Sequence, residues 1–542
     1  MHTQRSFKDK GRRSRLSFPA VRRVASAMAL CLGASVIFSS TPSFATTPTF
    51  NETLDPNAVR ESMHYLMNTF DVSEEEALRR LELQNNAQKL NALLKEQQSG
   101  SYGGMHIDHE RGGRLIVSMT RPVDAEPYIR GMRDRANVET REVKHSRREL
   151  KRERENISKK IGEGPDSIYL TTIDVERNTV VLWERDWIAD LKANGNWKKI
   201  SGPRSAKAPS SARQQEPSTA GQTSVSTERA NANSAVAAAP FAIERRVLQK
   251  PKPKYTPFVD WGYCHPLYCK SGYGGMRGGL RLNIQRDSGY WGGCTAGFNV
   301  RSSGGSHPGW GWVLTAGHCV VGKTNNTSIH HNGYNILRPH GIAGGYYMEL
   351  NSYPYDFAFL NYLDGNRSIA WLEDHWGRNK VLKYCRNGGW DSNQDTWCGT
   401  QAKSENHYLD GYHSLEDMNT GWIVCASGSG SDEKNYPASH GSGAGEDYLV
   451  GTRCGRIIGW DGGIITDICA RAGDSGGPLF SQLDDTAYGI LSGGLQSRSG
   501  PCQPGERNNY VALSTIYETM DSWRDSGYTG GSTFRVITSV TG

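Results

Sequence analysis

The cysteines divide this chain into two unlike parts. Ten of the eleven cysteines follow residue 263, and the eleventh, Cys31, lies in an N-terminal apolar run. An even set of cysteines confined to one part of a chain is typical of a disulfide framework formed in an oxidising compartment. The sequence therefore predicts a C-terminal unit crosslinked by five disulfides. The alternative is a metal site at CHPLYC, residues 264–269, but no second ligand pair has matching spacing, so we expect neither a metal nor another cofactor.

Residues 1–45 have the layout of a secretory signal peptide. A basic opening precedes an apolar run from Val24 to Phe38, and small residues follow up to Ala45. We expect cleavage after Ala45 and a secreted product, with a lipid anchor at Cys31 as the alternative. The apolar run is too short for a membrane span, and no other segment approaches about 18 apolar residues, so we expect no span.

Residues 46–200 contain no cysteine and predict helices together with a small α/β unit. Ser73 stands three residues before Glu76 at the head of a segment with helical leucine spacing, the pattern of a capped amphipathic helix. The segments GRLIVSMT and SIYLTTIDVERNTVVLW are rich in β-branched residues and predict strands.

Charge is unevenly distributed along the chain. Residues 1–246 carry 39 Lys and Arg against 30 Asp and Glu, whereas the remainder carries 24 against 26, so the net charge of +7 belongs to the N-terminal half. The densest part, residues 141–160, predicts a solvated helix, and the alternative is a basic surface for a partner. Because the C-terminal half has no basic excess, we expect no nucleic-acid partner. A nucleic-acid or surface-binding role for residues 46–200 is kept as an alternative.

Residues 201–250 are rich in Ser, Ala, Pro and Gln and nearly free of large apolar side chains. Such a segment buries too little surface to fold, so we expect a disordered linker. Arg245 and Arg246, near its end, form a candidate cleavage site.

From residue 251 onward, short β-branched and aromatic runs such as GWVLTAGHC, DFAFLNYL and NNYVALSTI alternate with Gly, Asn, Asp and Ser. This texture predicts an all-β unit with many turns over residues 251–525. The segment YETMDSWRD predicts a closing helix near residue 525, and residues 526–542 follow as a C-terminal tail.

Three residues in this unit have the types and the order of a nucleophilic triad. A serine hydroxyl attacks a carbonyl only when a base takes its proton and donors hold the oxyanion. Ser475 lies in GDSGG, His318 lies in LTAGHC, and Asp356 heads the apolar run DFAFL. Singly, each has a structural alternative: a tight turn, a core histidine and a strand cap. The order His318, Asp356, Ser475 is one of three known orders for a Ser-His-Asp triad, which favours the joint catalytic interpretation.

With these motifs the sequence resembles the chymotrypsin-fold serine proteases, in particular the secreted bacterial branch that includes streptogrisins and α-lytic protease. The resemblance covers most of residues 270–525 and rests on CTAGF, LTAGHC, DFAFL, CARAGDSGGPL and GILSGG. It implies two antiparallel six-stranded β-barrels, about residues 270–385 and 400–525, in a monomeric endopeptidase that cleaves proteins or peptides. Residues 46–200 resemble that branch's pro-region through YGGMHIDHERGGRLIVSMT, which implies a folding aid and inhibitor.

The resemblance also implies a role for each motif residue. Ser475 would be the nucleophile, His318 the general base and then acid, and Asp356 the group that orients the imidazole. The backbone N–H groups of Gly473 and Ser475 would form the oxyanion hole.

The strand that would hold the substrate backbone begins at Ser492, which would also support the aspartate, and continues through Gly493 and Gly494. A preference for Lys or Arg needs a carboxylate near the pocket floor, where Asp467 is the one nearby candidate. Because Leu491 offers no cation for Glu and the glycines leave the walls open, we expect cleavage after bulky apolar or aromatic residues.

The family pattern implies three disulfides: Cys294–Cys319, Cys425–Cys454 and Cys469–Cys502. The other four cysteines have no counterpart in that pattern, and they are paired by exclusion only as Cys264–Cys269 and Cys385–Cys398.

Extra material around residues 365–420 and 428–450 departs from that branch, and we expect these loops to reshape or cover the substrate cleft. A second hypothesis is a catalytically inactive, protease-like secreted binding protein. Loss of activity usually shows as a missing triad member or an altered nucleophile loop, and the sequence has neither.

Overall fold

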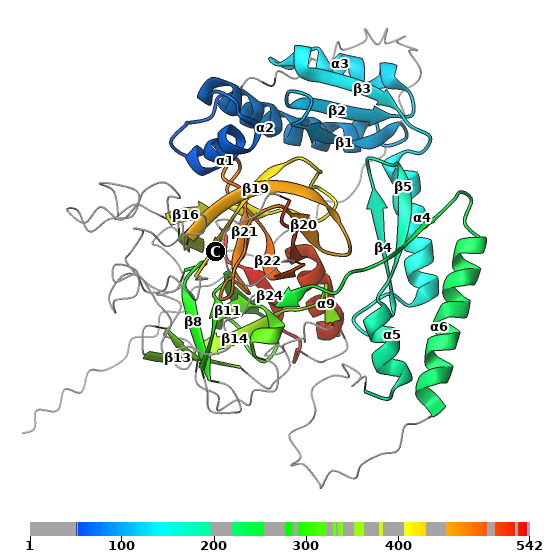
Figure 1. Cartoon of the computed structure of the whole chain (residues 1–542), viewed down its shortest axis with the longest axis vertical. Coiled ribbons are helices and arrows are strands. Elements are labelled where there is room, and N and C mark those ends of the chain that lie inside the picture. The colour runs from blue at the N-terminus through cyan, green and yellow to red at the C-terminus, as the bar shows by residue number, and fades with distance from the viewer. Residues whose placement is uncertain are drawn as a thin grey trace, which may run out of the picture. The chain divides into compact units, whose positions relative to one another are not determined.

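The computed structural model describes most of the chain after residue 49, and Figure 1 shows its elements. The described residues are Phe50, 52–196, 219–253, 277–285, 291–320, 329–331, 334–339, 352–362, 379–382, 406–429, 451–495, 505–525 and 529–538. The predicted signal peptide, the segment CHPLYC, both predicted extra loops for the most part, and Cys385, Cys398 and Cys502 lie outside these residues. We call residues 52–253 the N-terminal region and residues 277–538 the C-terminal region.

Two helices open the N-terminal region. They are α1 (Arg60–Phe70) and α2 (Glu74–Gln97). As the sequence predicts, Ser73 caps α2: its side chain accepts a hydrogen bond from the backbone N–H of Glu76 at 3.2 Å. A three-stranded sheet follows, formed by β1 (Tyr102–Asp108), β2 (Arg114–Met119) and β3 (Val138–Glu142).

The predicted charged helix is α4 (Arg147–Ile161). Ser146 and Glu149 form a capping box at its start, and Gly162 ends it in the left-handed conformation with φ 64°. A second sheet follows, formed by β4 (Tyr169–Asp174), β5 (Thr179–Glu184) and β6 (Glu244–Val247), together with the helix α5 (Asp186–Ala193).

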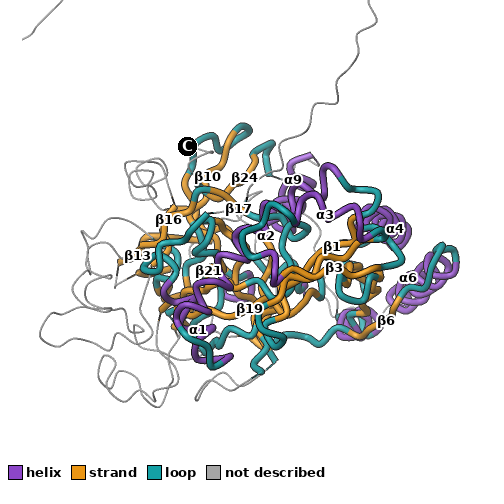
Figure 2. The backbone as a smooth tube through the Cα atoms, turned by 90° about the horizontal axis from the view of Figure 1, so that it is seen from above, coloured by secondary structure: helices purple, strands orange, loops and turns teal. Residues whose placement is uncertain are grey.

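The prediction of a disordered linker over residues 201–250 is wrong for its second half. Residues Thr219–Ala237 form the helix α6, which lies beside α4 in both views (Figures 1 and 2) and shares a core with it. Ala232 and Ala235 are fully buried in that core. The composition misled because small side chains bury little area each, yet they let helices pack closely. Arg245 and Arg246, the predicted cleavage site, lie in β6, which pairs in parallel with β5.

Six strands of the C-terminal region close into a barrel. The order is β22–β21–β18–β19–β20–β23, and β23 pairs again with β22. The strands are β18 (Ile423–Gly428), β19 (Gly451–Trp460), β20 (Ile464–Thr466), β21 (Pro478–Phe480), β22 (Thr486–Gly494) and β23 (Asn508–Ala512). Short strands β7 (Lys252–Pro253) and β17 (Gly411–Tyr412) also pair with β22.

The predicted first barrel is an eight-stranded sheet in which no pairing among the described residues closes the ring. Its order is β24–β10–β11–β14–β13–β12–β8–β9. The strands are β8 (Arg281–Gln285), β9 (Trp291–Thr295), β10 (Asn299–Ser303), β11 (Gly311–Thr315), β12 (Ile329–His331), β13 (Tyr334–Pro339), β14 (Ala358–Tyr362) and β24 (Thr533–Val536). Of the two six-stranded barrels that the resemblance implies, the described residues therefore show one closed barrel, and a second barrel is not shown.

Three elements of the C-terminal region lie outside both of these sheets. β15 (Asn379–Leu382), at the end of the first predicted barrel, and β16 (Asn406–Leu409), at the start of the second, form a separate pair. The predicted closing helix is present as α9 (Leu513–Asp525).

The predicted C-terminal tail contributes a strand to the fold. Within it, β24 pairs antiparallel with β10 and buries Phe534 and Val536 in a core shared by the barrel and the large sheet. The many glycines of the tail concealed this alternation of apolar and polar residues.

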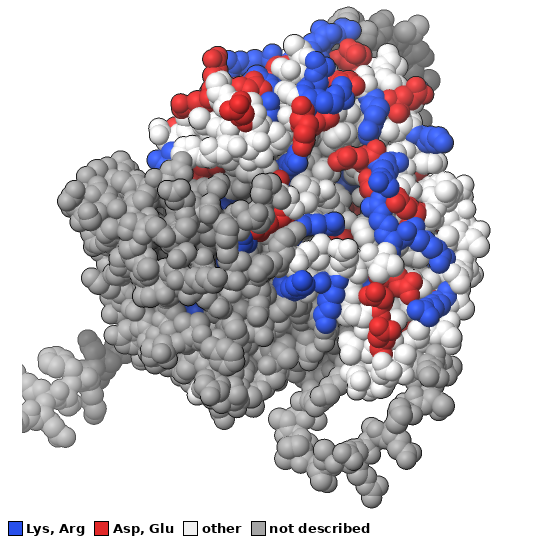
Figure 3. Space-filling model, in the orientation of Figure 1, with Lys and Arg blue, Asp and Glu red and all other residues white. Residues whose placement is uncertain are grey.

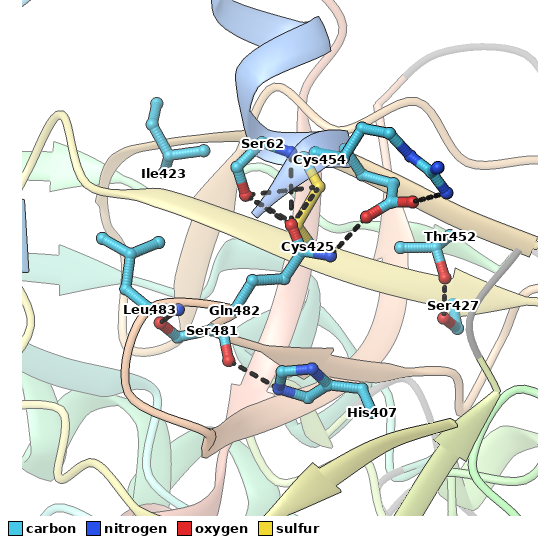
Figure 4. The surroundings of a disulfide bond; sticks show 12 residues. Ser62, His407, Ile423, Cys425, Ser427, Thr452, Cys454, Ser481, Gln482 and Leu483 are labelled. Carbon is cyan, nitrogen blue, oxygen red and sulfur yellow. Dashed lines mark hydrogen bonds and ion pairs between the residues drawn. A yellow bond between two sulfur atoms is a disulfide. The ribbon is translucent and has the colours of Figure 1, made fainter. Parts of the chain in front are cut away.

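The N-terminal region contacts the C-terminal region through α1 at a disulfide. Figure 4 shows Ser62 of α1 above the Cys425–Cys454 bond. The Ser62 hydroxyl lies 3.3 Å from Cys425 Sγ and donates to Gln482 Oε1 at 2.8 Å, while the Gln482 amide donates to Glu61 at 2.7 Å.

A second contact uses the predicted charge run. Lys151 pairs with the Glu416 carboxylate at 2.7 Å, Arg147 donates to the Glu416 carbonyl at 2.7 Å, and Lys95 of α2 pairs with Asp417 at 2.7 Å. Basic side chains of α4 therefore contact the C-terminal region, while most charged side chains of this helix are exposed, as predicted for a solvated helix. On the face shown in Figure 3, Lys and Arg are interspersed with Asp and Glu.

None of the helices in the described ranges combines the length and apolar character needed to cross a bilayer.

Candidate active site

The large sheet brings His318 and Asp356 together. His318 lies in a 3-10 turn (Gly317–Cys319) directly after β11, and Asp356 lies two residues before β14. β11 and β14 are neighbours, with Thr315 opposite Ala358, so the residues just beyond these two positions meet at one edge of the sheet. The Cys294–Cys319 disulfide ties the histidine turn to the end of β9.

His318 contacts a carboxylate on one side and a hydroxyl on the other. Its Nδ1 lies 2.7 Å from Asp356 Oδ2, and its Nε2 lies 2.8 Å from Ser475 Oγ. The backbone N–H of His318 also donates to Asp356 Oδ1 at 2.8 Å. The Ser492 hydroxyl donates to Asp356 Oδ2 at 2.7 Å, so both oxygens of this fully buried carboxylate accept hydrogen bonds. A carboxylate held in this way keeps the imidazole in one orientation.

The barrel supplies Ser475 from a tight turn before β21. Gly473 has φ 102° and Gly476 has φ 86°, a conformation that residues with a side chain rarely adopt. A Cβ on Gly476 would lie 2.1 Å from the hydroxyl oxygen of Thr315, so the turn needs glycine for close approach as well. The carbonyl of Gly473 accepts from the Thr295 hydroxyl at 2.7 Å and that of Ser475 accepts from the Thr295 N–H at 2.8 Å.

Two buried ion pairs that the sequence did not predict flank this turn. Arg453 pairs with Asp474 at 2.9 Å, and the same carboxylate accepts from the backbone N–H of Arg471 at 2.9 Å. The Arg471 side chain in turn pairs with Glu506 at 2.5 Å, with both side chains almost fully buried. In the sequence, the charged residues Arg471 and Asp474 next to the nucleophile could have indicated buried ion pairs, but only the fold shows that their partners are Glu506 and Arg453.

The strand expected to bind the substrate backbone, β22, is paired with another strand of the same chain, β7. In the antiparallel pairing of β22 with β7, Gly493 lies opposite Pro253 and Gly494 lies opposite Lys252. A Cβ on Gly493 would lie 2.3 Å from the carbonyl oxygen of Lys252, so this approach of two backbones requires glycine. Ser475 is fully buried in this arrangement.

Asp467, the acid considered for a basic-specific pocket, has other partners. Its carboxylate accepts from Tyr65 of α1 at 2.7 Å and from the backbone N–H and the side chain of Arg456 at 2.7 and 3.2 Å. Burial raises the pKa of Asp467, while these hydrogen bonds lower it. Asp467 thus serves the contact between the two regions of the chain.

The described cysteines are in disulfide bonds. The structure joins Cys294 to Cys319 and Cys425 to Cys454, the two pairs that the resemblance implies within the described residues. Cys469 is also disulfide-bonded, and its predicted partner Cys502 lies outside the described ranges. Among the described residues, Cys294 and Cys319 also approach His318 closely enough to suggest metal ligands, but their sulfurs are bonded to each other and offer no thiolate.

A closed six-stranded barrel that meets a second β-sheet across a histidine–serine contact fits the chymotrypsin-fold serine proteases, and comparison with known proteins returns this class. The chain is 28% identical to streptogrisin-D of Streptomyces griseus over 197 residues, which are 36% of this chain and 43% of the relative. The match therefore spans less than half of the relative's length. The predicted resemblance is confirmed at this level: the chain is similar to bacterial chymotrypsin-fold serine proteases.

Solved structures of the same class are also similar to this chain. Thermobifida fusca protease A matches at 19% identity, over 48% of this chain and 99% of that one, with a TM-score of 0.28. A chymotrypsin of Cellulomonas bogoriensis matches at 20% identity, over 48% of this chain and 98% of that one, with a TM-score of 0.26. No protein-family model matches the chain.

Proposed function

We propose that this chain is a secreted serine endopeptidase, made as an inactive pre-pro-protein, that cleaves peptide bonds through an acyl-enzyme. The observation that carries the proposal is the position of His318 between Asp356 and Ser475, at 2.7 and 2.8 Å. A hydroxyl and an imidazole at this distance allow direct proton transfer when the hydroxyl attacks a carbonyl carbon.

In the proposed mechanism, Ser475 attacks the scissile carbonyl while His318 Nε2 takes its proton. The resulting imidazolium is stabilised by Asp356, which is itself held by Ser492. The backbone N–H groups of Gly473 and Ser475 donate to the oxyanion. The Asp474 carbonyl, which shares a peptide with the Ser475 N–H, accepts from the Gly477 N–H at 2.8 Å, and Thr295 holds the carbonyls of Gly473 and Ser475, so this turn needs little reorganisation when the charge develops. His318 then returns the proton to the leaving amine, and water completes the cycle.

A phosphonylating serine reagent tests this proposal on the mature enzyme. We expect one adduct, located at Ser475 by peptide mass spectrometry, and loss of peptide hydrolysis in proportion to labelling. Ser475→Ala is the matched control and should neither label nor cleave, while retaining the fold. Failure of the folded wild-type protein to label at Ser475 would instead favour the catalytically inactive binding protein.

We further propose that the N-terminal region is the inhibitor of the same chain. The strand β7 lies along Gly493 and Gly494, where the substrate backbone would lie, so substrate and β7 exclude each other. Arg246 is held in β6 by an ion pair with Asp174 at 2.9 Å. We therefore expect the maturation cleavage to occur on the C-terminal side of Pro253 rather than after Arg245 or Arg246. N-terminal sequencing of the secreted product checks this, and a product that begins directly after Arg246 would contradict it.

Substrate preference remains as the sequence predicts it, for bulky apolar or aromatic residues before the cut. The pairing of Asp467 with Arg456 supports this, because that carboxylate keeps a cationic partner from its own region after the N-terminal region is removed. Peptide amides that differ only in this residue test the preference, and faster cleavage after Lys or Glu than after Phe and Leu would refute it.

A further inference from the structure

A buried polar cluster of Tyr353, Asp461 and Asn509 takes no part in the proposed chemistry. The Tyr353 hydroxyl donates to Asp461 Oδ1 at 2.6 Å, and the Asn509 amide donates to Asp461 Oδ2 at 2.7 Å and to the Tyr353 hydroxyl at 3.2 Å. The three residues are 0%, 3% and 1% exposed in the order Tyr353, Asp461, Asn509. Burying polar groups costs free energy unless they are hydrogen-bonded, and these three residues offset that cost by bonding to one another. The exact placement of all three is therefore needed.

The cluster joins the two parts of the structure that the triad also joins. Asp461 directly follows β19, and Asn509 belongs to β23 of the barrel, where it lies opposite Gly493 of β22. Tyr353 precedes Asp356 by three residues, in the segment that enters the large sheet. A turn closed by a hydrogen bond from the Tyr355 N–H to the Ser352 carbonyl, at 2.9 Å, makes this segment compact.

The triad depends on the alignment of these same two parts. His318 and Asp356 come from the large sheet, whereas Ser475 and Ser492 come from the barrel. A misplacement of about 1 Å between catalytic groups can lower a rate about 100-fold. A tether from the barrel to the segment carrying Asp356 therefore acts directly on the geometry that the reaction needs.

We propose that Asp461 is a positioning residue for the catalytic triad, which through the Tyr353 hydroxyl, and together with Asn509, holds the segment bearing Asp356 in register with the barrel. This inference rests on the proposed function. Asp461 touches neither Ser475 nor His318, so it positions the triad and takes no part in proton transfer.

The space around the cluster is adapted to it. A Cβ on Gly463 would lie 2.4 Å from the Tyr353 hydroxyl, so only glycine leaves room for that hydroxyl to reach Asp461. Burial raises the pKa of Asp461 to about 6, while the Tyr353 hydroxyl, the charge of Arg507 and the donors Gly463 N–H and Asn509 lower it. The carboxylate is thus the acceptor for several donors that come from both parts of the structure.

The test compares Tyr353→Phe and Asp461→Asn in mature enzyme obtained from the full chain. Tyr353→Phe removes only the hydroxyl, and Asp461→Asn keeps the shape but replaces one acceptor oxygen by an amide. Tyr488→Phe is the matched control, since it removes another fully buried hydroxyl, from β22 of the same barrel. Rates are expressed per active site titrated with the phosphonylating reagent, so that misfolded molecules are not counted.

We expect kcat to fall about 10-fold to 100-fold in both variants, with KM changed less than about twofold, and Tyr488→Phe to retain the kcat of the wild type. A kcat within about twofold of the control would overturn the inference and leave the cluster a stability feature only. A change confined to KM would overturn it as well. If Asp461→Asn gives no titratable sites, Tyr353→Phe decides. A wild type that neither labels nor cleaves refutes the proposed function itself, which is a separate result.

Discussion

Arg185 gives the sharpest prediction about the contact between the two regions. This arginine precedes α5 in the N-terminal region and is fully buried. Its guanidinium donates to the backbone carbonyls of Ser352 and Tyr353 in the C-terminal region, at 3.3 and 3.0 Å, and also to carbonyls of its own region. Burial lowers the pKa of Arg185 to about 10. Through Arg185, the N-terminal region therefore binds the backbone of the segment that leads to Asp356.

The expected effect of Arg185→Met follows from these contacts. Two hydrogen bonds from a charged donor contribute about 1.5 to 3 kcal/mol each, and their loss leaves two buried carbonyls without that donor. Removal of a buried charge offsets part of this cost. A net loss of about 3 kcal/mol corresponds to about a 150-fold weaker complex, since about 1.4 kcal/mol is tenfold.

The assay is inhibition of mature enzyme by the separately produced N-terminal region, residues 46–253. We expect the inhibition constant to rise about 100-fold or more for Arg185→Met and to change little for Arg229→Met, whose exposed guanidinium pairs with Glu184 inside the same region. An increase below about threefold for Arg185→Met would refute the assignment of this contact.

Three further predictions address charge, pH and the nucleophile turn. Glu416→Gln with Asp417→Asn should weaken inhibition by the N-terminal region several-fold at low salt and hardly at all in about 1 M salt, because these partly exposed ion pairs are screened. His109 lies 2.7 Å from the Gly421 carbonyl, and burial, helped by the charges of Arg80 and Arg456 and opposed by Glu110 and that hydrogen bond, lowers its pKa to about 4. A histidine in the released N-terminal region has a pKa of about 6.5, so protonation favours the released state. The affinity of the N-terminal region for mature enzyme should therefore be constant above that pH and fall below it, by about 30-fold at about pH 5. His109→Gln should flatten the pH dependence of the inhibition constant. Asp474→Asn should lower kcat and the midpoint of thermal unfolding together, because it leaves Arg453 buried without its carboxylate; unchanged values in both would contradict the role of that ion pair.

The sequence predicted chemistry better than it predicted architecture. The triad residues stand in short motifs whose residue types and chain order suggested that they meet, and the structure brings His318, Asp356 and Ser475 within hydrogen-bond distance. The helix α6 escaped detection because its apolar residues are small, and β24 because it follows a glycine-rich stretch. Such elements are stabilised by tertiary packing that local composition does not encode.

The contacts that depend on long-range pairing were the hardest to foresee. Asp461 lies 108 residues from Tyr353 and 48 from Asn509, and each of the three is an ordinary turn or strand residue in its own sequence neighbourhood. The position of Lys252 was equally hard to foresee, because it depends on the pairing of β7 with β22, in which Lys252 lies opposite Gly494. A single sequence can identify reactive groups, but it does not show which distant residues hold them in place.

The strand β22 is where these separate interactions converge. Ser492 supports Asp356 from this strand, Gly493 lies opposite Asn509 on one side and opposite Pro253 on the other, and Leu491 exchanges backbone hydrogen bonds with the nucleophile turn at Gly476 and Gly477. One strand therefore connects the aspartate, the nucleophile turn, the Asp461 cluster and β7, the segment that we propose to be inhibitory. Because β7 pairs with the strand that also contacts the triad, the proposed inhibited complex can hold the catalytic groups in working geometry while it excludes substrate. On this argument, release of β7 alone is sufficient for activity, with no rearrangement of His318, Asp356 or Ser475.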